Sequence, residues 1–188
     1  MPIKNEIIAQ TLDSEYGRHA YEATEKLQDA GYDTWWVGGG VRDMLKGKIP
    51  KDIDIATAAK PEEIEKLFGR SSGGEHTFGS MRVSLGKDTY EVTTFREDDE
   101  ASDGRHPEAI VFSTRDKDAK RRDFTVNALY YQPITKEFFD PYGGEGDLRE
   151  NLIKFIGDPT TRITHDALRI LRAVRFRALL NGQYHPET

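Results

Sequence analysis

The chain has 188 residues, a net charge of -6 at pH 7, and 36% hydrophobic and 32% charged residues. This length suits one domain, or one domain with part of another, and the hydrophobic content is sufficient for a core. Cysteine is absent, which excludes thiolate metal sites, cysteine nucleophiles and disulfides. No apolar run reaches the length of a membrane span and no signal-peptide h-region is visible, so we expect a soluble, cytoplasmic protein.

The charge is unevenly distributed along the chain. Residues 151–188 contain six Lys or Arg against three Asp or Glu, so this end carries +3 and residues 1–150 carry -9. An acidic front and a basic end suit a site that holds a metal ion in one part and phosphates in another.

The first half of the chain predicts helices and strands in mixed order. Residues 14–30 carry apolar side chains at steps of three and four, which predicts an amphipathic helix, and Gly31 is placed to end it. The other predicted elements are strands at 32–37 and 53–56, helices at 40–46 and from Pro61 onward, and a hairpin of strands 81–85 and 90–95.

The second half is less regular. Residues 96–109 lack apolar periodicity and predict a mobile surface loop, whereas 121–131 are ambiguous, with a helix favoured around 126–128. The clearest late helix is 164–180, with Thr164 as its N-cap. Strands are predicted at 109–113 and 137–140. Strands and helices without regular alternation favour an α+β fold.

Two aspartates stand one residue apart in the second predicted strand. Because side chains alternate along a strand, Asp52 and Asp54 share one face while Ile53 and Ile55 point to the core. Such a pair suits Mg²⁺, which commonly binds one or two carboxylates together with substrate phosphates. Glu91, in YEVTTFR, is the best candidate for a third carboxylate. An isolated D-x-D, however, is more often a solvated strand edge.

Three glycines, Gly38 to Gly40, follow a predicted strand and precede a predicted helix. Glycine there allows unusual backbone angles and brings main-chain N–H groups close to an anion. Arg42 lies in the first helical turn, where its guanidinium could bind a phosphate, whereas Asp43 is expected to hold local structure. A glycine run alone usually marks a turn. Together with the aspartates, it indicates a nucleoside triphosphate that meets a metal ion.

The segment GGGVRDMLKGKIPKDIDIAT resembles the signature of the class II tRNA nucleotidyltransferases and bacterial poly(A) polymerases, within the polymerase-β-like superfamily. The further blocks that match in family order are FGSMRVSL, YEVTTFR, SDGRHPEAIVF, RRDFTVNALYY, DPYGGEGDL and HDALRILRAVRF. The resemblance extends from about Tyr32 to Leu180. It implies an α+β nucleotidyltransferase head at 1–148, with a small mixed sheet flanked by helices, and the start of an all-helical neck at 149–188.

The resemblance also implies roles for single residues. Asp52 and Asp54 would bind the catalytic Mg²⁺ ions, with Glu91 as the third catalytic carboxylate. The residues implied to bind the nucleotide are Gly38, Gly39, Arg42, Arg122, Asp123, Asn127, Asp166, Arg169, Arg172 and Arg175. In isolation, Arg121 and Arg122 would be interpreted as a solvated basic pair.

The late helix HDALRILRAVRFR places arginines three residues apart, with Leu168, Leu171 and Val174 on an apolar side. Alone, this pattern is typical of an amphipathic helix with a basic outer face. In the family, however, the E-D-x-x-R motif here reads the incoming base: Asp166 would accept from an amine and Arg169 would donate to ring acceptors. ATP and CTP both present that pattern. His165 replaces the family's Glu, which affects strict base choice.

The implied reaction is attack of an RNA 3′ hydroxyl on the α-phosphate of CTP or ATP, with release of pyrophosphate. SDGRHPEAIVF resembles the loop of CCA-adding enzymes more than that of poly(A) polymerases, which favours addition of C and A to the tRNA 3′ end. The alternatives are a poly(A) polymerase, a split CC-adding or A-adding enzyme, and a non-catalytic nucleotide- or RNA-binding module.

The chain ends soon after the base-reading helix. The family continues into further neck, body and tail regions that grip the tRNA acceptor arm. The alternatives are therefore a fragment from which these regions are missing, which we favour, and a minimal member that needs a partner. With its acidic front, such a piece should bind RNA weakly and in a salt-sensitive way.

Overall fold

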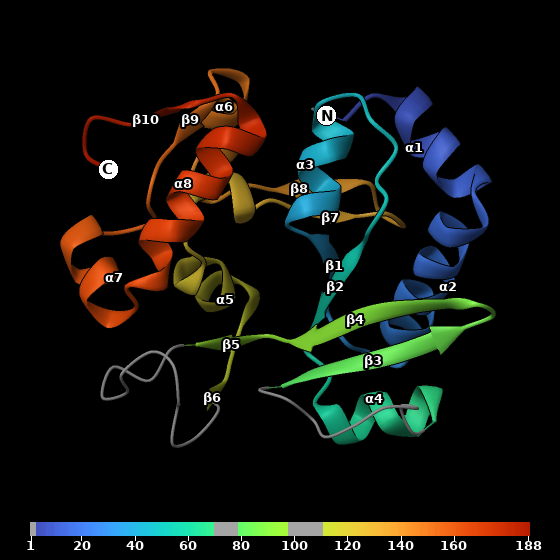
Figure 1. Ribbon diagram of the computed structural model, residues 1–188. Helices are drawn as coiled ribbons and strands as arrows, with labels where there is room; N and C mark the ends of the chain where they lie inside the picture. Colours follow the sequence, from blue (N-terminus) through green and yellow to red (C-terminus); the bar gives the residue numbers. More distant parts are fainter. Residues whose placement is uncertain (1–2, 70–78, 98–110) are drawn as a thin grey trace.

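The computed structural model describes residues 3–69, 79–97 and 111–188 (Figure 1). Among these residues the main sheet has six strands, in the order β3-β4-β2-β1-β7-β8. The only parallel pair in it is β2 with β4, so the sheet is mixed. In chain order its strands are β1 (Thr34–Val37), β2 (Asp54–Thr57), β3 (Ser80–Leu85), β4 (Asp88–Thr94), β7 (Tyr130–Gln132) and β8 (Glu137–Phe139).

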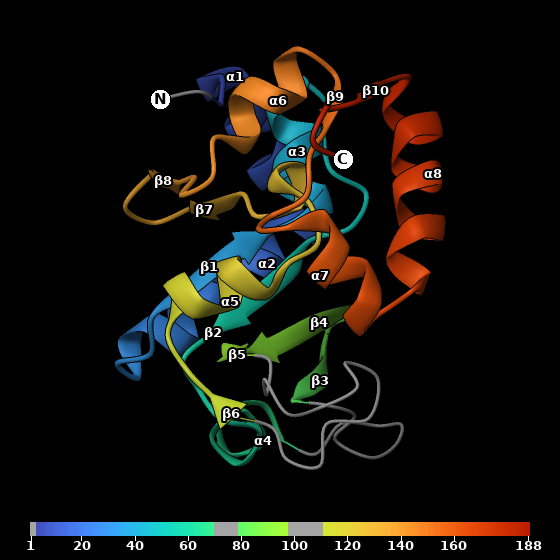
Figure 2. The same cartoon turned by 90° about the vertical axis from the view of Figure 1, so that its left-hand side faces the viewer.

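Helices cover both faces of this sheet. The described helices are α1 (Asn5–Asp13), α2 (Glu15–Asp29), α3 (Gly39–Leu45), α4 (Pro61–Phe68), α5 (Arg115–Arg121), η1 (Thr125–Asn127), α6 (Gly144–Arg149), α7 (Pro159–His165) and α8 (Leu168–Leu180). Figure 2 shows α2 and α5 on opposite sides of β1 and β2. Within the described part of the chain, none of these helices has the length and apolar character needed to cross a bilayer.

Strand β1 separates two hydrophobic clusters because its side chains alternate between the faces. Trp36 lies in the larger cluster with side chains of α2, whereas Trp35 and Val37 lie in the smaller cluster with Ala119 of α5. All four residues of β1 are therefore buried. A strand that is buried on both faces appears in the sequence as a short apolar run, as at residues 35–37.

Most of the predicted elements of the first half are confirmed. The helix predicted at 14–30 is α2, whose first turn is capped by the Ser14 hydroxyl accepting from the Gly17 N–H at 3.0 Å. The predicted hairpin is β3 and β4, and a helix begins at Pro61 as expected. Helix α1 was not predicted, although Ile7 and Ile8 pack into the larger cluster.

Two predictions for the middle of the chain need correction. Residues 96 and 97, predicted as loop, form β5 (Arg96–Glu97), which pairs with β6 (Val111–Phe112) because a partner distant in sequence supplies its hydrogen bonds. Residues 98–110, including most of the predicted loop and of SDGRHPEAIVF, lie outside the described residues. The ambiguous segment 121–131 contains η1 and the start of β7, so the helical turn favoured at 126–128 is a short 3₁₀ turn.

The single helix predicted at 164–180 is wrong, because the structure has two helices there. Asp158 caps α7 by accepting from the Thr161 N–H at 2.7 Å, and Pro159 occupies the first turn, so a helix starts before Thr164. Asp166 then adopts an extended conformation (φ -152°, ψ 102°) and ends α7. The break falls at the residue that the family resemblance assigns to base reading.

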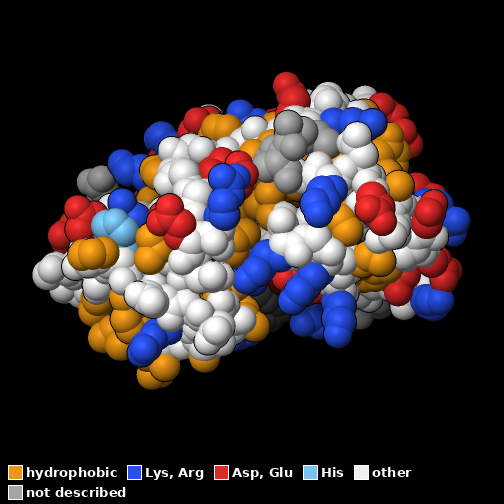
Figure 3. All heavy atoms as spheres, turned by 90° about the horizontal axis from the view of Figure 1, so that it is seen from above, with side chains coloured by type: hydrophobic (Ala, Val, Ile, Leu, Met, Phe, Trp, Pro, Cys, Tyr) orange, Lys and Arg blue, Asp and Glu red, His pale blue; other side chains and the backbone are white. Residues whose placement is uncertain are grey.

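Helix α8 buries a different face from the predicted apolar side. Ala173, Phe176 and Leu180 pack inward, whereas Leu168, Leu171 and Val174 are exposed by 47%, 66% and 55%. Figure 3 shows hydrophobic side chains exposed on the side of the molecule where α8 lies. After α8, β10 (Gln183–Tyr184) pairs in parallel with β9 (Leu152–Ile153).

Helix α3 packs so closely on the loop before β2 that a methyl group added at Gly40 should destabilise the fold. A Cβ atom at Gly40 would lie 2.6 Å from the carbonyl oxygen of Asp52, which is main chain and cannot rotate away. We expect Gly40→Ala to lower the free energy of unfolding by about 1–3 kcal/mol in urea titrations.

Gly146 offers a matched control within α6, because no heavy atom lies within 4 Å of its added Cβ. Gly146→Ala should leave the stability unchanged or raise it by up to about 1 kcal/mol, since alanine favours helices over glycine. Equal stability of the two variants would contradict the close packing of α3 on the loop.

Candidate active site

The paired aspartates lie where β2 meets its two neighbouring strands. Antiparallel pairing sets Asp54 opposite Val37, and parallel pairing sets Ile55 beside Val92, so Glu91 of β4 lies next to Asp54. The intervening Ile53 is buried, as the alternation predicted. Burial, together with the negative charges of Asp52 and Glu91, raises the pKa of Asp54 to about 6. The site therefore has an excess of negative charge that a cation would relieve.

Asp52 is held in place by Tyr16 of α2. The Tyr16 hydroxyl donates to Asp52 Oδ1 at 3.1 Å and accepts from the Ile53 N–H at 3.3 Å. Its ring lies on that of Tyr90, with centroids 4.7 Å apart, and the Tyr90 hydroxyl donates to the Tyr16 carbonyl at 2.7 Å. Burial raises the pKa of Tyr16 to about 12, so the hydroxyl remains a donor at neutral pH. Sequence reasoning assigned Tyr16 only to the apolar face of a helix.

The glycine turn brings the acidic and basic groups together. Gly38 has φ 67° and ψ -124°, a backbone conformation that disfavours any other residue. A Cβ atom there would lie 3.8 Å from Asp54 Oδ2 and 3.7 Å from Arg122 Nη1. Two predicted site residues that are far apart in sequence thus approach the same backbone position.

Arg42 points into the protein from α3 and is only 8% exposed. Its guanidinium donates to Asn127 Oδ1 and lies 5.3 Å from the ring centroid of Phe176 in α8. A Cβ atom at Gly39 would lie 3.6 Å from Arg42 Nη2. The pKa of Arg42 is lowered mainly by burial. The positive charge of Arg175, in α8, lowers it further.

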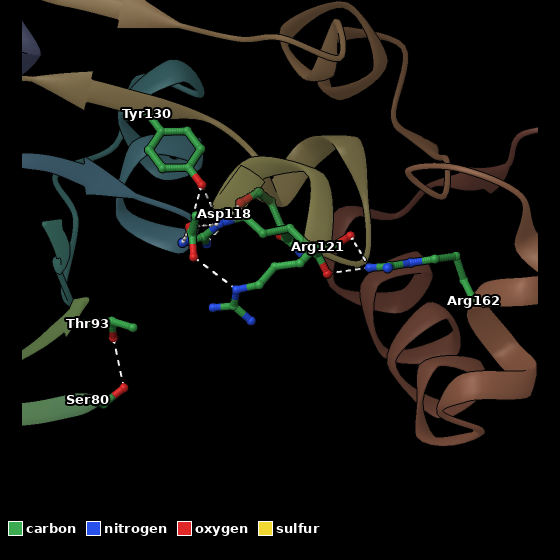
Figure 4. Close-up of polar contacts among 8 residues, drawn as sticks. Ser80, Thr93, Asp118, Arg121, Tyr130 and Arg162 are labelled. Carbon is green, nitrogen blue, oxygen red and sulfur yellow. Dashed lines mark hydrogen bonds and ion pairs between the residues drawn. The ribbon is translucent and has the colours of Figure 1, made fainter. Parts of the chain in front are cut away.

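Arg122 is fixed by two side chains that the sequence analysis did not single out. Asp118 Oδ2 accepts from Arg122 Nη2 at 3.0 Å and from the Tyr130 hydroxyl at 2.7 Å (Figure 4). Tyr130 in turn accepts from Arg122 Nε at 2.8 Å. Burial would raise the pKa of Asp118, but the positive charges of Arg122 and Arg121 outweigh it, and the pKa lies below its usual range. The i,i+4 spacing of Asp118 and Arg122 was a signal that could have indicated this pair.

Asp123 and Asn127 join this segment to α8. Asp123 Oδ1 accepts from the Phe124 N–H at 2.8 Å and from Asn127 Nδ2 at 2.9 Å. The other oxygen, Oδ2, accepts from Arg172 Nε at 2.6 Å. Asp123 therefore contacts two other predicted nucleotide-binding residues, Asn127 and Arg172.

The proposed base-reading residues lie at the break between α7 and α8. Asp166 Oδ1 accepts from the Leu168 N–H at 3.0 Å, while Arg169 Nη1 donates to the Arg162 carbonyl at 3.0 Å. Arg162 itself donates through Nη2 to the carbonyl oxygens of Arg121 and, at 2.7 Å, of Arg122 (Figure 4). Sequence reasoning did not identify Arg162.

The carboxylates at this site supply only part of the ligand shell of a metal ion. Within residues 3–69, 79–97 and 111–188, no three Asp, Glu or His side chains are grouped so that they alone could hold a metal. Asp52 and Asp54 nevertheless fit Mg²⁺, which commonly takes one or two carboxylates and completes its shell with substrate phosphates and water.

The six-stranded mixed sheet flanked by helices matches the head domains of CCA-adding enzymes. The chain superimposes on the crystal structure of the *Bacillus stearothermophilus* CCA-adding enzyme in complex with CTP with a TM-score of 0.81, at 35% identity, over 93% of this chain and 42% of that one. The chain belongs to the poly(A) polymerase head domain family, whose model matches residues 34–154.

Curated relatives carry two different names. Poly(A) polymerase I of *Salmonella typhi* is 41% identical over 181 residues, which cover 90% of this chain and 39% of that protein. The CCA-adding enzyme of *Lactobacillus helveticus* is 39% identical over 170 residues, which cover 90% of this chain and 42% of that protein. The chain thus spans about two fifths of the length of these relatives.

The raised pKa of Asp54 predicts a pH-dependent gain in stability when its charge is removed. Because this pKa lies above the ordinary value of 3.8, the folded protein binds more protons than the unfolded chain between about pH 4 and 6, so this group's contribution to stability falls as the pH rises through that window. In EDTA at pH 7.5, Asp54→Asn should raise the free energy of unfolding by about 1–3 kcal/mol.

The same measurement at pH 3.5 should show a much smaller difference, because Asp54 is then mainly protonated in both states. Glu25→Gln, which removes an exposed carboxylate in the middle of α2, is the control and should change little at either pH. An Asp54→Asn protein no more stable than the unchanged chain at pH 7.5 would contradict the crowding of charges at this site.

Proposed function

We propose that this chain is the catalytic head of a template-independent nucleotidyltransferase that adds C and A to the 3′ end of tRNA from CTP and ATP. The observation that carries the proposal is the approach of Asp54 Oδ2 and Arg122 Nη1 to the Gly38 turn. A carboxylate for a metal, a cation for a phosphate and an open backbone position meet there. Acting on tRNA, such an enzyme would work in the cytoplasm.

In this mechanism Asp52 and Asp54 would hold Mg²⁺, with Glu91 as a third carboxylate beside them. The bound metal would lower the pKa of the RNA 3′ hydroxyl and stabilise the leaving pyrophosphate. Tyr16 keeps the Asp52 carboxylate oriented through its 3.1 Å hydrogen bond. These residues supply position and charge, and the reaction needs no covalent enzyme intermediate.

The triphosphate would lie along the turn at Gly38 and Gly39, with Arg42 and Arg122 neutralising its charge. Arg122 is well prepared for this role, because Asp118 and Tyr130 restrict its guanidinium before any ligand arrives. Asp123 and Asn127 would act on the phosphates or ribose, and Arg172 and Arg175 would support the pocket from α8.

The base would be read at the break between α7 and α8. Asp166 would accept from the exocyclic amine and Arg169 would donate to a ring acceptor, a pattern that ATP and CTP share. We further propose that the head spans residues 1–148 and that a helical neck begins at 149, with body and tail regions gripping the tRNA acceptor arm.

Poly(A) addition is the second candidate, because relatives named poly(A) polymerase I match the chain as well as the CCA-adding enzymes do. A split enzyme that adds only CC or only A would have the same site. The resemblance of SDGRHPEAIVF to the loop of CCA-adding enzymes favours CCA addition.

The test is incorporation of labelled nucleotides into tRNA that lacks its 3′-terminal CCA, with each triphosphate in turn and Mg²⁺. It is run with this chain and with the complete reading frame that encodes it. We expect addition of C and then A, which Asp54→Ala reduces to background and Glu25→Ala leaves unchanged. Chelation of Mg²⁺ should also abolish incorporation.

Other outcomes would assign a different function. Addition of A alone to unrelated RNA would identify a poly(A) polymerase, and CC or A alone would identify a split enzyme. Nucleotide binding by the complete protein without any incorporation would favour a binding module and refute the catalytic proposal.

A further inference from the structure

Arg162 of α7 contacts both halves of the proposed nucleotide site, although no sequence motif marked it. Its guanidinium donates through Nη2 to the main-chain carbonyls of Arg121 and Arg122. These carbonyls lie at the C-terminal end of α5. The last C=O groups of a helix have no N–H partner within the helix and need a donor from elsewhere. A charged donor satisfies them with stronger hydrogen bonds than a neutral donor would.

The segment held by Arg162 is the one that carries the phosphate-binding arginine. Arg122 follows α5 directly, and its side chain is bonded to Asp118 and Tyr130. Its position is therefore determined at the main chain by Arg162 and at the guanidinium by two other residues.

The main chain of Arg162 holds the two residues proposed to read the base. Its carbonyl accepts from the Asp166 N–H at 3.3 Å and from Arg169 Nη1 at 3.0 Å. A single residue thus connects Arg122 on one side with Asp166 and Arg169 on the other.

We propose that Arg162 is a positioning residue that sets the distance between Arg122 and the Asp166–Arg169 pair, and thereby determines which bases the site accepts. The inference rests on the proposed function, because it deepens the role given to that pair. A hydrogen bond to a base edge weakens steeply outside about 2.7–3.2 Å, so a correct base is recognised only if the triphosphate is anchored at a fixed distance from the reading groups. Releasing α7 from the Arg121–Arg122 carbonyls removes that constraint.

A purely structural role for Arg162 makes a different prediction. If its bonds only stabilise the fold, their loss should weaken the binding of all nucleotides by a similar factor. If they set the distance to the base, their loss should affect mainly the nucleotides that form the base contacts. The ratio of affinities therefore distinguishes the two roles, whereas overall affinity and stability do not.

The experiment measures dissociation constants of ATP, CTP, GTP and UTP by titration calorimetry with Mg²⁺ and without RNA, so that no transfer occurs. The unchanged chain should bind ATP and CTP about tenfold or more tightly than GTP and UTP. Arg162→Met keeps the length of the side chain without its donors, and should reduce that preference to about threefold or less. Arg162→Lys, which keeps a charged donor, should restore part of the preference.

Arg149→Met is the matched control, because Arg149 is an exposed arginine on α6 that pairs only with Glu145 among the described residues. It should retain the full preference. Thermal unfolding of each variant accompanies the titrations, and Arg162→Lys provides a second variant if Arg162→Met folds poorly.

An equal loss of affinity for all four nucleotides in the Arg162 variants would overturn the proposal, as would an unchanged chain without any preference among them. If the complete protein prefers ATP and CTP but transfers neither to RNA, the proposed function alone would be refuted. In that case the loss of preference on substitution would still support the role of Arg162.

Discussion

The antiparallel pairing of β1 with β2 is the contact on which the candidate site depends. It sets Asp54 opposite Val37, one residue before the glycine turn, and so brings the carboxylate proposed to bind metal beside the backbone proposed to bind phosphate. A shift of one residue in this register would exchange the faces of Asp54 and Ile55, so that Asp54 would point to the face that Ile55 now occupies. The buried β1 and the isoleucines of β2 prevent that shift, because it would place a carboxylate in the larger hydrophobic cluster.

The charges around β1 and β2 differ between two groups of residues: the carboxylates near Asp54 carry an excess of negative charge, whereas two nearby arginines are paired with aspartates. Asp52 and Glu91 disfavour ionisation of Asp54, whereas Asp118 and Asp123 each accept from an arginine. The excess negative charge around Asp54 is consistent with the proposed Mg²⁺ site. Ion pairs with Asp118 and Asp123 hold Arg122 and Arg172 in place, which would orient them before the proposed triphosphate binds.

Sequence patterns predicted the fold wherever a local signal was strong. Apolar periodicity indicated α2, and alternation with a central turn indicated the β3–β4 hairpin. The predictions failed where partners lie far along the chain or where local signals compete. The pairing of β5 with β6 has no local signal in the sequence. The apolar series from 164 to 180 predicts one helix, whereas Asp158 and Pro159 begin an earlier one.

The sequence by itself determined which chemical groups the site contains, because Asp52, Asp54, Gly38, Arg42 and Arg122 stand in motifs whose spacing and order are specific. Only the tertiary structure decided what holds them. Tyr16 reaches Asp52 across 36 residues, Tyr130 reaches Asp118 across 12, and Arg162 reaches the Arg122 carbonyl across 40. A lone tyrosine or arginine carries no signal of its partner, since strand register and helix packing alone bring such distant groups within hydrogen-bonding distance.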